Sequence, residues 1–577
     1  MLHVDASPFY GSTDATLPLP QFLSLLSSGG ALSGGAIHTF APPAPLPASL
    51  LPFARHVMVD LCPRVLLAQG ALSSLLVASD AARYLTFRRV DRCFVGCGGS
   101  QQLLRVPASK ADVFSDGALG LLEKRAVMRF LQAATDGVAW AGGGGEGGAA
   151  GNGGGGDAGG VAQLNEAALG AARSLLRPQN KAPSRVDEGA FAGAPFGDLL
   201  AEMGLSGRAG AMVRGALALE GCGGAPWGAV GGAVGMARSR SYLAALARFG
   251  GSAFLSYEYG SGTLCEAFCR LAAVHGGIYV LGGAPQGWRA EGGGLAAALP
   301  EHGEVRARAA LLPPRRAAGA RCSLVVCLAL LRAAGTWEEE GGGADAEGAA
   351  PPPFVSSFHV ALPPAPPSRP FSAAALRLGH PARMAPPGFA TLAVYAEVGQ
   401  GEEEGAAASL AEEARTLAAW DGGGAGEAPL RLLWHVAYAV RCGSGADGDA
   451  PPLPAGVWEA TAAPGGVWGG CTVVGEDVVG AAEGLFRGLF PGAPFFQPFE
   501  AAPPHEECGG QGEGAAEEAA HAAGADAGAD AGAGEGAAAP PQPPPPAAPA
   551  APAEAPAELD LAQALALLRE EPLPDFL

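Results

Sequence analysis

Lysine is almost absent from this 577-residue chain. Lys110, Lys124 and Lys181 are its three lysines, against 33 arginines. None of them follows a glycine, so the phosphate-binding loop G-x-x-x-x-G-K-[ST] is excluded. Charged residues make up only 16% of the chain and aromatic residues only 7%. This composition is typical of codon bias, so it is a weaker guide to function than usual.

No apolar run in the sequence is long enough to cross a membrane. Leu324–Leu331 is one of the longest, far below the ~18 residues that a membrane-spanning helix needs. The chain begins MLHVDASP, with Asp5 where a signal peptide has a basic and then an apolar stretch. Its last residues carry no lipidation motif. We therefore expect a cytosolic protein.

The eleven cysteines are odd in number and lie among apolar neighbours. This pattern predicts free thiols in a reducing compartment. Cys93 with Cys97, and Cys265 with Cys269, are each spaced closely enough to begin a metal site. Neither pair has a second pair and nearby histidines to complete it, so we expect no bound metal.

The formal charge is −20, but most of it lies in one segment. From Glu500 to the C-terminus there are 15 acidic residues and one basic residue, Arg569, a net of −14. The rest of the chain carries −6. Nucleic-acid binding needs a basic face, which these totals argue against. A local basic patch for an acidic protein partner is still compatible with them.

Sequence signatures of catalysis are also lacking. There is no G-x-S-x-G nucleophile elbow. A G-x-G-x-x-G pattern occurs at Gly443–Gly448, but Asp449, Ala450 and two prolines follow it in place of a helix. The histidines are isolated, and Glu402–Glu404 stand in a segment that we interpret as a solvated linker. From the residues alone we expect a non-catalytic binding protein without a cofactor.

Glycine and proline, at 90 and 50 residues, are abundant and form about 24% of the chain. That level is close to the one expected of low-complexity sequence. Segments rich in Gly, Ala, Pro and Glu cannot bury enough apolar surface to order themselves. They are 141–185, 336–353, 399–427 and the acidic, Pro/Ala-rich 499–577. The blocks between them have globular texture. A short amphipathic helix is expected at Leu559–Arg569.

Apolar periodicity predicts both helices and strands, which indicates a mixed α/β fold. Helices are expected at Leu61–Ala78, Leu119–Ala133, within Phe196–Leu219, and at Ser241–Phe249, Phe268–Val274 and Ala481–Leu489. Strands are expected at Tyr84–Phe87, Arg92–Val95, Gly276–Leu281, Leu392–Glu397 and Leu432–Ala439.

Six stretches of the chain are similar to one protein family and occur in that family's order. They are Leu2–Ser12 (LHVDASPFYGS), Val59–Val90, Val106–Leu131, Tyr242–Leu281 and, more weakly, Arg431–Trp434 and Ala481–Pro498. Together they cover roughly half of the chain. The family is that of the Rab escort proteins and the Rab GDP-dissociation inhibitors (GDIs). The resemblance implies a GDI-like fold related to FAD-binding flavoproteins but used for protein binding.

The resemblance also assigns roles to the blocks. Residues 1–140 match the first part of a large, sheet-containing Rab-binding domain, with their end entering a smaller all-helical domain. Residues 186–240 match the helical, prenyl-binding domain, 241–335 the return to the large domain, and 354–498 its last part, with a disordered insertion at 399–427. We expect 141–185 to be an insertion, 336–353 a linker and 499–577 a disordered tail. The family's first strand, glycine turn and helix are missing here, which favours an incomplete gene model.

The resemblance separates escort proteins from inhibitors by one pair of residues. Escort proteins carry a Phe and an Arg eleven residues apart that contact the Rab geranylgeranyltransferase. Phe114 and Arg125 have this spacing in ADVFSDGALGLLEKR. Aromatic and Arg side chains are common hot spots, because one fills a pocket and the other forks onto carboxylates. The alternative is that Phe114 packs on its own helix and Arg125 pairs with a neighbouring acid.

Recognition of the folded GTPase is implied at a platform and a loop. The platform residues are Tyr10, Thr263, Arg270 and Val280, of which Thr263 replaces a Glu and Val280 a longer apolar residue. The mobile loop is Arg248–Tyr259, with Arg248, Phe254, Tyr257 and Tyr259. Its aromatic residues are expected either to be exposed for binding or to pack into the sheet.

Two apolar sites are implied for the Rab C-terminus and its lipid. The C-terminus patch is Leu76, Val77, Tyr84 and Leu85. The prenyl groove is Leu200, Met203, Met212, Val213 and Leu217. The same residues are also suited to an ordinary core, and glycines near them would allow the helices to part.

The function that the resemblance implies is that of an escort protein. It would bind GDP-bound Rab GTPases, present them to the geranylgeranyltransferase, shield the prenyl groups and deliver the Rab to membranes. Alternatives are a Rab GDI that recycles prenylated Rab, a flavin-dependent oxidoreductase of the amine-oxidase type, and a decayed paralogue.

Overall fold

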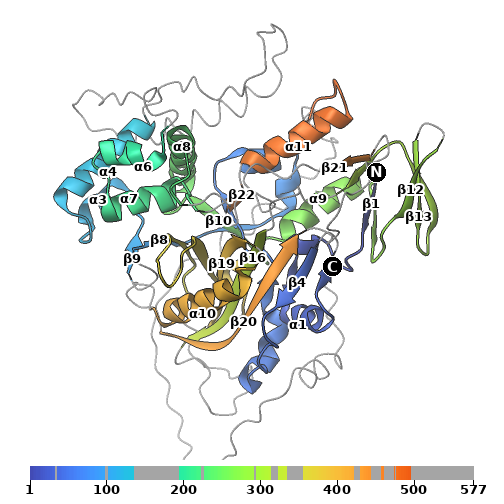
Figure 1. Ribbon diagram of the computed structural model, residues 1–577, viewed down its shortest axis with the longest axis horizontal. Helices are drawn as coiled ribbons and strands as arrows, with labels where there is room; N and C mark the ends of the chain where they lie inside the picture. The colour runs from blue at the N-terminus through green and yellow to red at the C-terminus, as the bar shows by residue number, and fades with distance from the viewer. Residues whose placement is uncertain are drawn as a thin grey trace, which may run out of the picture. The chain divides into compact units, whose positions relative to one another are not determined.

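A nine-stranded sheet is the centre of the computed structural model (Figure 1). In order across the sheet, the strands are β3 (Ala31–Leu32), β4 (Gly35–Thr39), β20 (Leu430–Cys442), β16 (Cys322–Ala333), β19 (Phe389–Gly399), β18 (Ala373–Gly379), β17 (Phe358–Leu362), β8 (Arg92–Gly96) and β9 (Leu103–Arg105). Neighbours are antiparallel except β17 and β8.

The structure describes 13 segments of the chain. They are residues 1–32, 35–97, 102–135, 194–221, 227–291, 294–312, 322–333, 355–399, 401–420, 429–442, 457–459, 473–474 and 476–495. The low-complexity segments 141–185, 336–353 and 499–577 and the helix expected at Leu559–Arg569 lie outside them.

Strand β16 shows why the sheet is buried on both faces. Its even-numbered residues from Leu324 to Leu330 belong to one apolar core, and its odd-numbered residues from Val325 to Leu331 belong to another. Side chains alternate between faces along a strand, so a strand covered on both sides is apolar throughout. The long apolar run at Leu324–Leu331 is therefore a doubly buried central strand.

One face of the sheet is covered by α10 (Glu403–Ala419), which corrects our interpretation of 399–427 as a disordered insertion. Leu410 and Leu417 are fully buried against the sheet. Glu403, expected in a solvated linker, is buried as well. Its carboxylate accepts a hydrogen bond from Ser323 Oγ at 3.0 Å and pairs with Arg441 at 3.2 Å. The Glu and Gly content hid an amphipathic helix whose buried face is mostly alanine.

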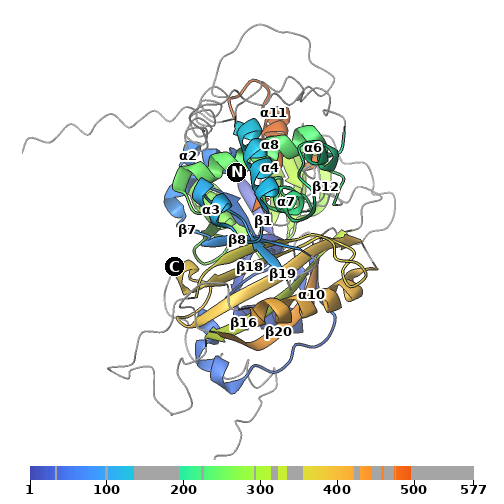
Figure 2. The same cartoon turned by 90° about the vertical axis from the view of Figure 1, so that its left-hand side faces the viewer.

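Five α-helices and one π-helical turn form a second group, here called the helical group. They are α3 (Lys110–Ser115), α4 (Leu121–Thr135), α6 (Phe196–Glu202), α7 (Gly207–Met212), η5 (Val213–Leu217, the π turn) and α8 (Gly232–Phe249). Figures 1 and 2 show these helices gathered on the opposite side of the sheet from α10. Their core is continuous with that face of the sheet, because Phe130, Phe196 and Met212 belong to the same cluster as Val326 and Tyr438.

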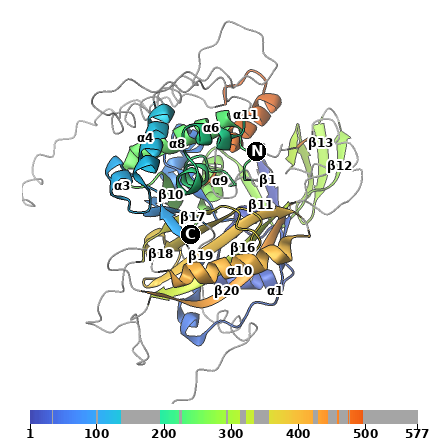
Figure 3. The ribbon, with the colours of Figure 1, turned by 60° about the vertical axis from the view of Figure 1, so that its left-hand side comes forward.

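A smaller four-stranded sheet lies beside the helical group (Figure 3). Its strands are β22 (Val473–Val474), β6 (Val65–Leu67), β10 (Phe254–Tyr257) and β7 (Phe87–Arg89). The helices near it are α2 (Ala71–Ala78), η3 (Ala81–Tyr84), α9 (Thr263–Val274) and α11 (Glu476–Leu489).

The remaining strands form small pairs and one three-stranded sheet. They are β1 (Leu2–Asp5) with β11 (Ile278–Leu281), β2 (Thr16–Pro18) with β5 (Met58–Asp60), β12 (Gln286–Glu291) with β13 (Gly294–Leu299) and β14 (Gly303–Ala307), and β15 (Ala310–Leu312) with β21 (Val457–Glu459). Further helices are η1 (Ser12–Asp14), α1 (Leu19–Ser27), η2 (Ala48–His56) and η6 (His380–Ala382).

The mixed α/β prediction is confirmed, as are most of the predicted elements. The helix expected at Leu61–Ala78 is wrong in its first half, because Val65–Leu67 is a buried strand and only Ala71–Ala78 is helical. The strand expected at Tyr84–Phe87 begins instead at Phe87, after a 3-10 turn that ends at Tyr84. Helix α8 crosses the expected boundary between 240 and 241. Within the described segments, no helix has the length and apolar composition to cross a membrane.

Candidate functional site

Phe114 and Arg125 lie on the first two helices of the helical group. Ser109 caps α3, where its hydroxyl accepts a hydrogen bond from the Asp112 backbone at 3.1 Å, and buried Val113 anchors the helix. Phe114, the next residue of α3, is 53% exposed. Arg125, in the second turn of α4, is exposed and has no ion pair among the residues that the structure describes. Both side chains are therefore exposed to solvent, and Arg125 does not form the ion pair of the alternative interpretation with any described residue.

The loop between the two helices is held by local hydrogen bonds. The Lys124 ammonium donates to the Phe114 carbonyl at 2.8 Å, and the Glu123 carboxylate accepts from the Gly120 backbone at 2.8 Å. These contacts tie the end of α3 to the start of α4. The positions of the Phe114 and Arg125 backbones relative to each other are thus set by the fold.

Two further exposed apolar residues stand beside this pair. Leu121 and Leu122, in the first turn of α4, are 64% and 77% exposed. Helical periodicity groups Leu122 with Ala126 and Phe130, four and eight residues later, both of which are buried. Leu122 is thus exposed although it shares a helix face with buried residues, and only the tertiary structure shows this.

The four platform residues lie on neighbouring elements. Strand β1 pairs in parallel with β11, with Val4 opposite Val280. The exposed ring of Tyr10 makes an edge contact with Tyr279, 5.9 Å between centroids. Arg270 is exposed on α9, the helix that precedes β11.

Thr263 and Val280, the two departures from the family pattern, are only half-buried. The Thr263 hydroxyl donates to the Gly260 carbonyl at 2.7 Å, at the start of α9. The backbone amide of Thr263 belongs to the same tight turn. Its side-chain hydroxyl therefore stabilises the helix start.

A buried carboxylate anchors the turn before α9. Asp60 accepts hydrogen bonds from the Ser261 backbone at 2.9 Å and from the Thr16 hydroxyl, which itself accepts from the Gly262 backbone at 2.8 Å. Burial raises the pKa of Asp60 to about 6, against the opposing effect of these hydrogen bonds. A Cβ on Gly260, whose φ is +95°, would overlap the Asp60 carboxylate. The platform helix thus starts from a tightly packed polar turn.

The structure corrects the mobile loop expected at Arg248–Tyr259. Phe254 and Tyr257 are buried in β10, between β6 and β7. An interior strand takes apolar and aromatic side chains that pack on its neighbours, which is the packing alternative stated above. Arg248 and Tyr259 remain exposed at the two ends, where the Arg248 guanidinium donates to Gln69. Tyr259 has a positive φ of 63°, uncommon outside glycine.

Only part of the expected C-terminus patch is accessible. Leu76 is buried in a small core with Leu66 and Tyr257, Tyr84 and Leu85 are half-buried, and Val77 is 65% exposed. Helix α11 packs against α2, the helix that carries Leu76 and Val77. In this structure Val77 is the main exposed apolar residue of the four.

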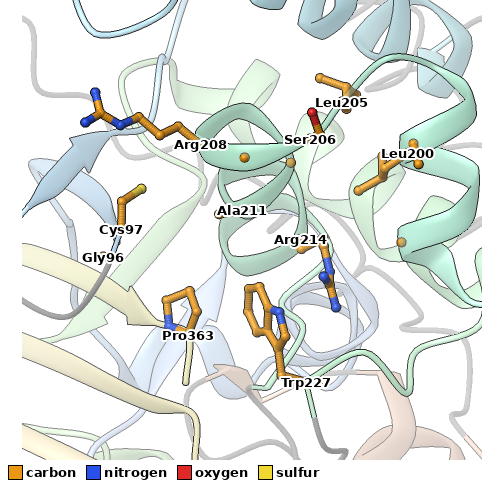
Figure 4. A pocket seen from close by; sticks show the side chains of 14 residues that line it. Gly96, Cys97, Leu200, Leu205, Ser206, Arg208, Ala211, Arg214, Trp227 and Pro363 are labelled. Atoms are coloured by element: carbon orange, nitrogen blue, oxygen red, sulfur yellow. The ribbon is translucent and has the colours of Figure 1, made fainter. Parts of the chain in front are cut away.

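The five residues of the expected prenyl groove are all buried. Met203, Met212, Val213 and Leu217 belong to the core of the helical group. Leu200 also lines a pocket of about 550 Å³ between α6, α7 and the ends of β8 and β17 (Figure 4). No group of His, Cys, Asp or Glu within the described part of the chain is arranged to hold a metal ion.

Comparisons with known proteins match parts of this chain. The family model for GDP dissociation inhibitors matches residues 1–137 and 231–309. The "Rab proteins geranylgeranyltransferase component A" of Drosophila melanogaster is 32% identical over 233 residues, which are 40% of this chain and 36% of that protein. The "Rab GDP dissociation inhibitor beta" of Canis lupus familiaris is 31% identical over 132 residues, 23% of this chain and 26% of that protein. The chain thus spans only about a quarter to a third of the length of these two relatives.

Among solved structures, a Rab GDI from Plasmodium falciparum is similar with a TM-score of 0.49 and 15% identity, covering 80% of this chain and 86% of that chain. Over the matched residues, the chain is similar to proteins named as Rab geranylgeranyltransferase component A, Rab escort protein and Rab GDP dissociation inhibitor.

Proposed function

We propose that this protein is a Rab escort protein, a non-catalytic accessory component of Rab geranylgeranyltransferase. It binds GDP-bound Rab GTPases in the cytosol, presents them to the transferase, shields the added geranylgeranyl groups and delivers the Rab to membranes in a transient contact. The observation that carries the proposal is the pair Phe114 and Arg125, both exposed on a hydrogen-bonded helix–loop–helix.

Each part of the proposed role falls to a different surface. Tyr10 and Arg270 of the platform, with Tyr259 at the nearby turn, contact the folded GTPase. Val77 and its half-buried neighbours hold the Rab C-terminus. The lipid enters the helical group only if its helices part, because the expected groove residues are buried. Opening such a core on binding avoids the cost of a permanent cavity.

The transferase contact uses a large aromatic side chain and a guanidinium. Phe114 fills an apolar pocket of the partner, and Arg125 forks onto its carboxylates or carbonyls, as hot-spot residues of these types do. Leu121 and Leu122, which are also exposed, lie about one turn before Arg125 on α4 and add apolar area to the surface of this helix. Exposed apolar residues that gather on one surface, rather than standing singly, are typical of interaction sites.

The test is transfer of labelled geranylgeranyl to a GDP-bound Rab by purified transferase, with and without this protein. We expect the protein to stimulate transfer. Phe114→Ala and Arg125→Ala should each raise the concentration needed for half-maximal stimulation about 30-fold, the effect of losing a hot spot of ~2 kcal/mol. Phe490→Ala is the matched control, since Phe490 is 55% exposed and lies at the end of α11.

The outcomes separate the related functions. No stimulation, together with extraction of prenylated Rab from membranes, would contradict the escort role and favour a Rab GDI. Equal loss of stimulation in the Phe490→Ala control would mean that exposed aromatics act non-specifically. A purified protein that absorbs near about 450 nm would instead carry a flavin and favour the oxidoreductase alternative.

A further inference from the structure

The two-stranded sheet of β15 and β21 presents an apolar pair of side chains to solvent. Leu311 and Trp458 lie opposite each other in the parallel register, and they are 52% and 41% exposed. Parallel strands are normally covered on both faces, and a sheet of two strands is only marginally stable by itself. This pair, here called the Leu311–Trp458 face, is therefore a candidate docking surface.

Helix α11 extends the Leu311–Trp458 face. A Cβ on Gly488 would lie 3.2 Å from the Trp458 indole, so the ring lies directly against the backbone of this helix. Gly484, one turn earlier, has open space where its Cβ would be. Figure 1 shows β21 near the end of α11. A second helix can therefore lie close to this side of α11 while it contacts Leu311 and Trp458.

The rim of the Leu311–Trp458 face is positively charged. Arg308, two residues before β15, is exposed and has no ion pair among the residues that the structure describes. Arg487 of α11 is 72% exposed, and its pair with Glu483 is a surface contact within one helix. Such pairs contribute little, so the Arg487 guanidinium can also attract another carboxylate. This rim favours an acidic occupant.

The chain itself contains a segment of matching chemistry. Leu559–Arg569 is the amphipathic helix expected from the sequence, and Leu561, Leu565 and Leu568 share one side of it. Its 11 residues are too few for a helix that is stable in isolation, so the leucine side needs a surface to pack on. Asp560, in its first turn, supplies a negative charge.

The connecting chain is long enough for this segment to reach α11. The described chain ends at Phe495, shortly after α11, and residues 496–558 supply 63 further residues. A chain of that length has a root-mean-square span on the order of 45 Å. Tethering also raises the local concentration of the segment to about the millimolar range. A weak contact is therefore sufficient for docking within one molecule.

We propose that Leu559–Arg569 docks as a helix on the Leu311–Trp458 face of its own molecule. The leucine side packs on this face and on the adjoining side of α11, and Asp560 pairs with Arg308 or Arg487. The contact covers the exposed apolar pair and holds the acidic C-terminal part of the chain close to the body. It is independent of the proposed escort function, because it uses none of the residues assigned to that function.

Photocrosslinking of the full chain tests the docking. Leu565 is replaced by the photo-reactive amino acid p-benzoylphenylalanine, and Gln563, on the opposite side of the expected helix, is the matched control position. After illumination, mass spectrometry identifies the crosslinked peptides. We expect position 565 to crosslink within one molecule to the peptides that contain Leu311, Trp458 or Gly484. Its yield should exceed that of position 563 at least about fivefold, because the two residues lie on opposite sides of a helix.

A change in the receiving surface provides the second measurement. Leu311→Asp should lower the crosslinking yield of position 565 at least about fivefold, because docking would bury an unpaired carboxylate. Leu2→Asp is the matched control, since Leu2 is 40% exposed and lies in the other parallel strand pair, β1 with β11. Leu311 is itself exposed, so its variant should keep the melting temperature of the wild type.

The remaining outcomes would overturn the proposal. A product of twice the mass, crosslinked through the same peptides, would assign the Leu311–Trp458 face to a second copy of the chain. Crosslinks to other parts of the chain, or equal yields from positions 565 and 563, would show that the segment does not dock there. An unchanged yield in Leu311→Asp would exclude this face as the receiving surface.

Discussion

At the scale of single residues, two buried titratable groups respond to acid in opposite directions. His359, on β17, is buried, its ring lies 5.0 Å from that of Phe254, and its Nε2 has no hydrogen-bond partner in the described part of the chain. Burial lowers its pKa from 6.5 to about 4. Asp60 has the reverse shift, from 3.8 to about 6. Neither shift can be read from the sequence, because both arise from burial by distant segments.

His359 makes the protein sensitive to acid. Between pH 6.5 and about 4 the unfolded chain binds a proton at this residue and the folded chain does not. The free energy of unfolding therefore falls by up to about 3 kcal/mol as the pH decreases through this range. We expect His359→Leu to remove this loss, measured by urea unfolding at pH 7 and near pH 4.5. The same pH dependence in the variant and the wild type would contradict the prediction.

Asp60 acts in the opposite sense. Between about pH 6 and 3.8 the folded protein binds a proton at Asp60 and the unfolded chain does not, so this residue favours folding as the pH falls. Its contribution is fully lost above about pH 6. We expect Asp60→Asn to show a steeper acid destabilisation than the wild type, by up to about 3 kcal/mol at pH 4. The prediction is ruled out if the free energy of unfolding, measured with urea, falls with pH in parallel for Asp60→Asn and the wild type.

At the scale of elements, α10 shows how composition can hide structure. Its segment is rich in Gly, Ala and Glu, which favoured an insertion, yet Leu410 and Leu417 are fully buried on the sheet. The sheet face that receives them is assembled from β16, β19 and β20, over 100 residues of chain. A sequence window does not contain that face, so the apolar stripe of α10 could not be recognised as a buried one.

The packing of α10 gives a direct test. Leu410→Ala should lower the free energy of unfolding by about 2–5 kcal/mol, because it leaves a cavity against the sheet. Glu412→Ala is the matched control on the exposed side of the same helix, where its ion pair with Arg415 is worth little. Chemical denaturation measures both. Equal and small effects would mean that this helix does not pack on the sheet.

Strand β6 of the smaller sheet illustrates a second limit of prediction from sequence. Pro63 and the apolar residues after it resemble a helix start, but Val65–Leu67 is a strand with all three side chains buried. Three apolar residues in a row suit a buried helix face or a buried strand equally. The choice is made by β10, almost 190 residues later, which supplies the backbone hydrogen bonds.

At the scale of the whole molecule, the helical group and the central sheet share one core. Phe196 of α6 and Tyr438 of β20 belong to the same apolar cluster. Gly235 of α8 lets α6 approach closely, since a Cβ at this position would lie 2.3 Å from the ring of Phe196. Strain at this contact is therefore transmitted to the sheet as well as to the helices.

We expect Gly235→Ala to lower the midpoint of a single thermal transition that includes both parts, with a cost of about 1–3 kcal/mol from overpacking. Gly484→Ala is the control, because a Cβ there meets open space on α11 and improves helix propensity. Calorimetry distinguishes the alternatives. Two separate transitions, of which only one shifts, would show that the helical group unfolds independently.

The sequence by itself determined the mixed α/β class, most helices and strands, and the similarity of part of the chain to the GDP dissociation inhibitor family. These depend on periodicity and on ordered local motifs, which any window of the chain contains. The tertiary structure alone decided that Leu122 is exposed, that Phe254 is buried and that Leu200 lines a pocket. Burial is set by which distant segments cover a side chain, and that is a property of the assembled fold.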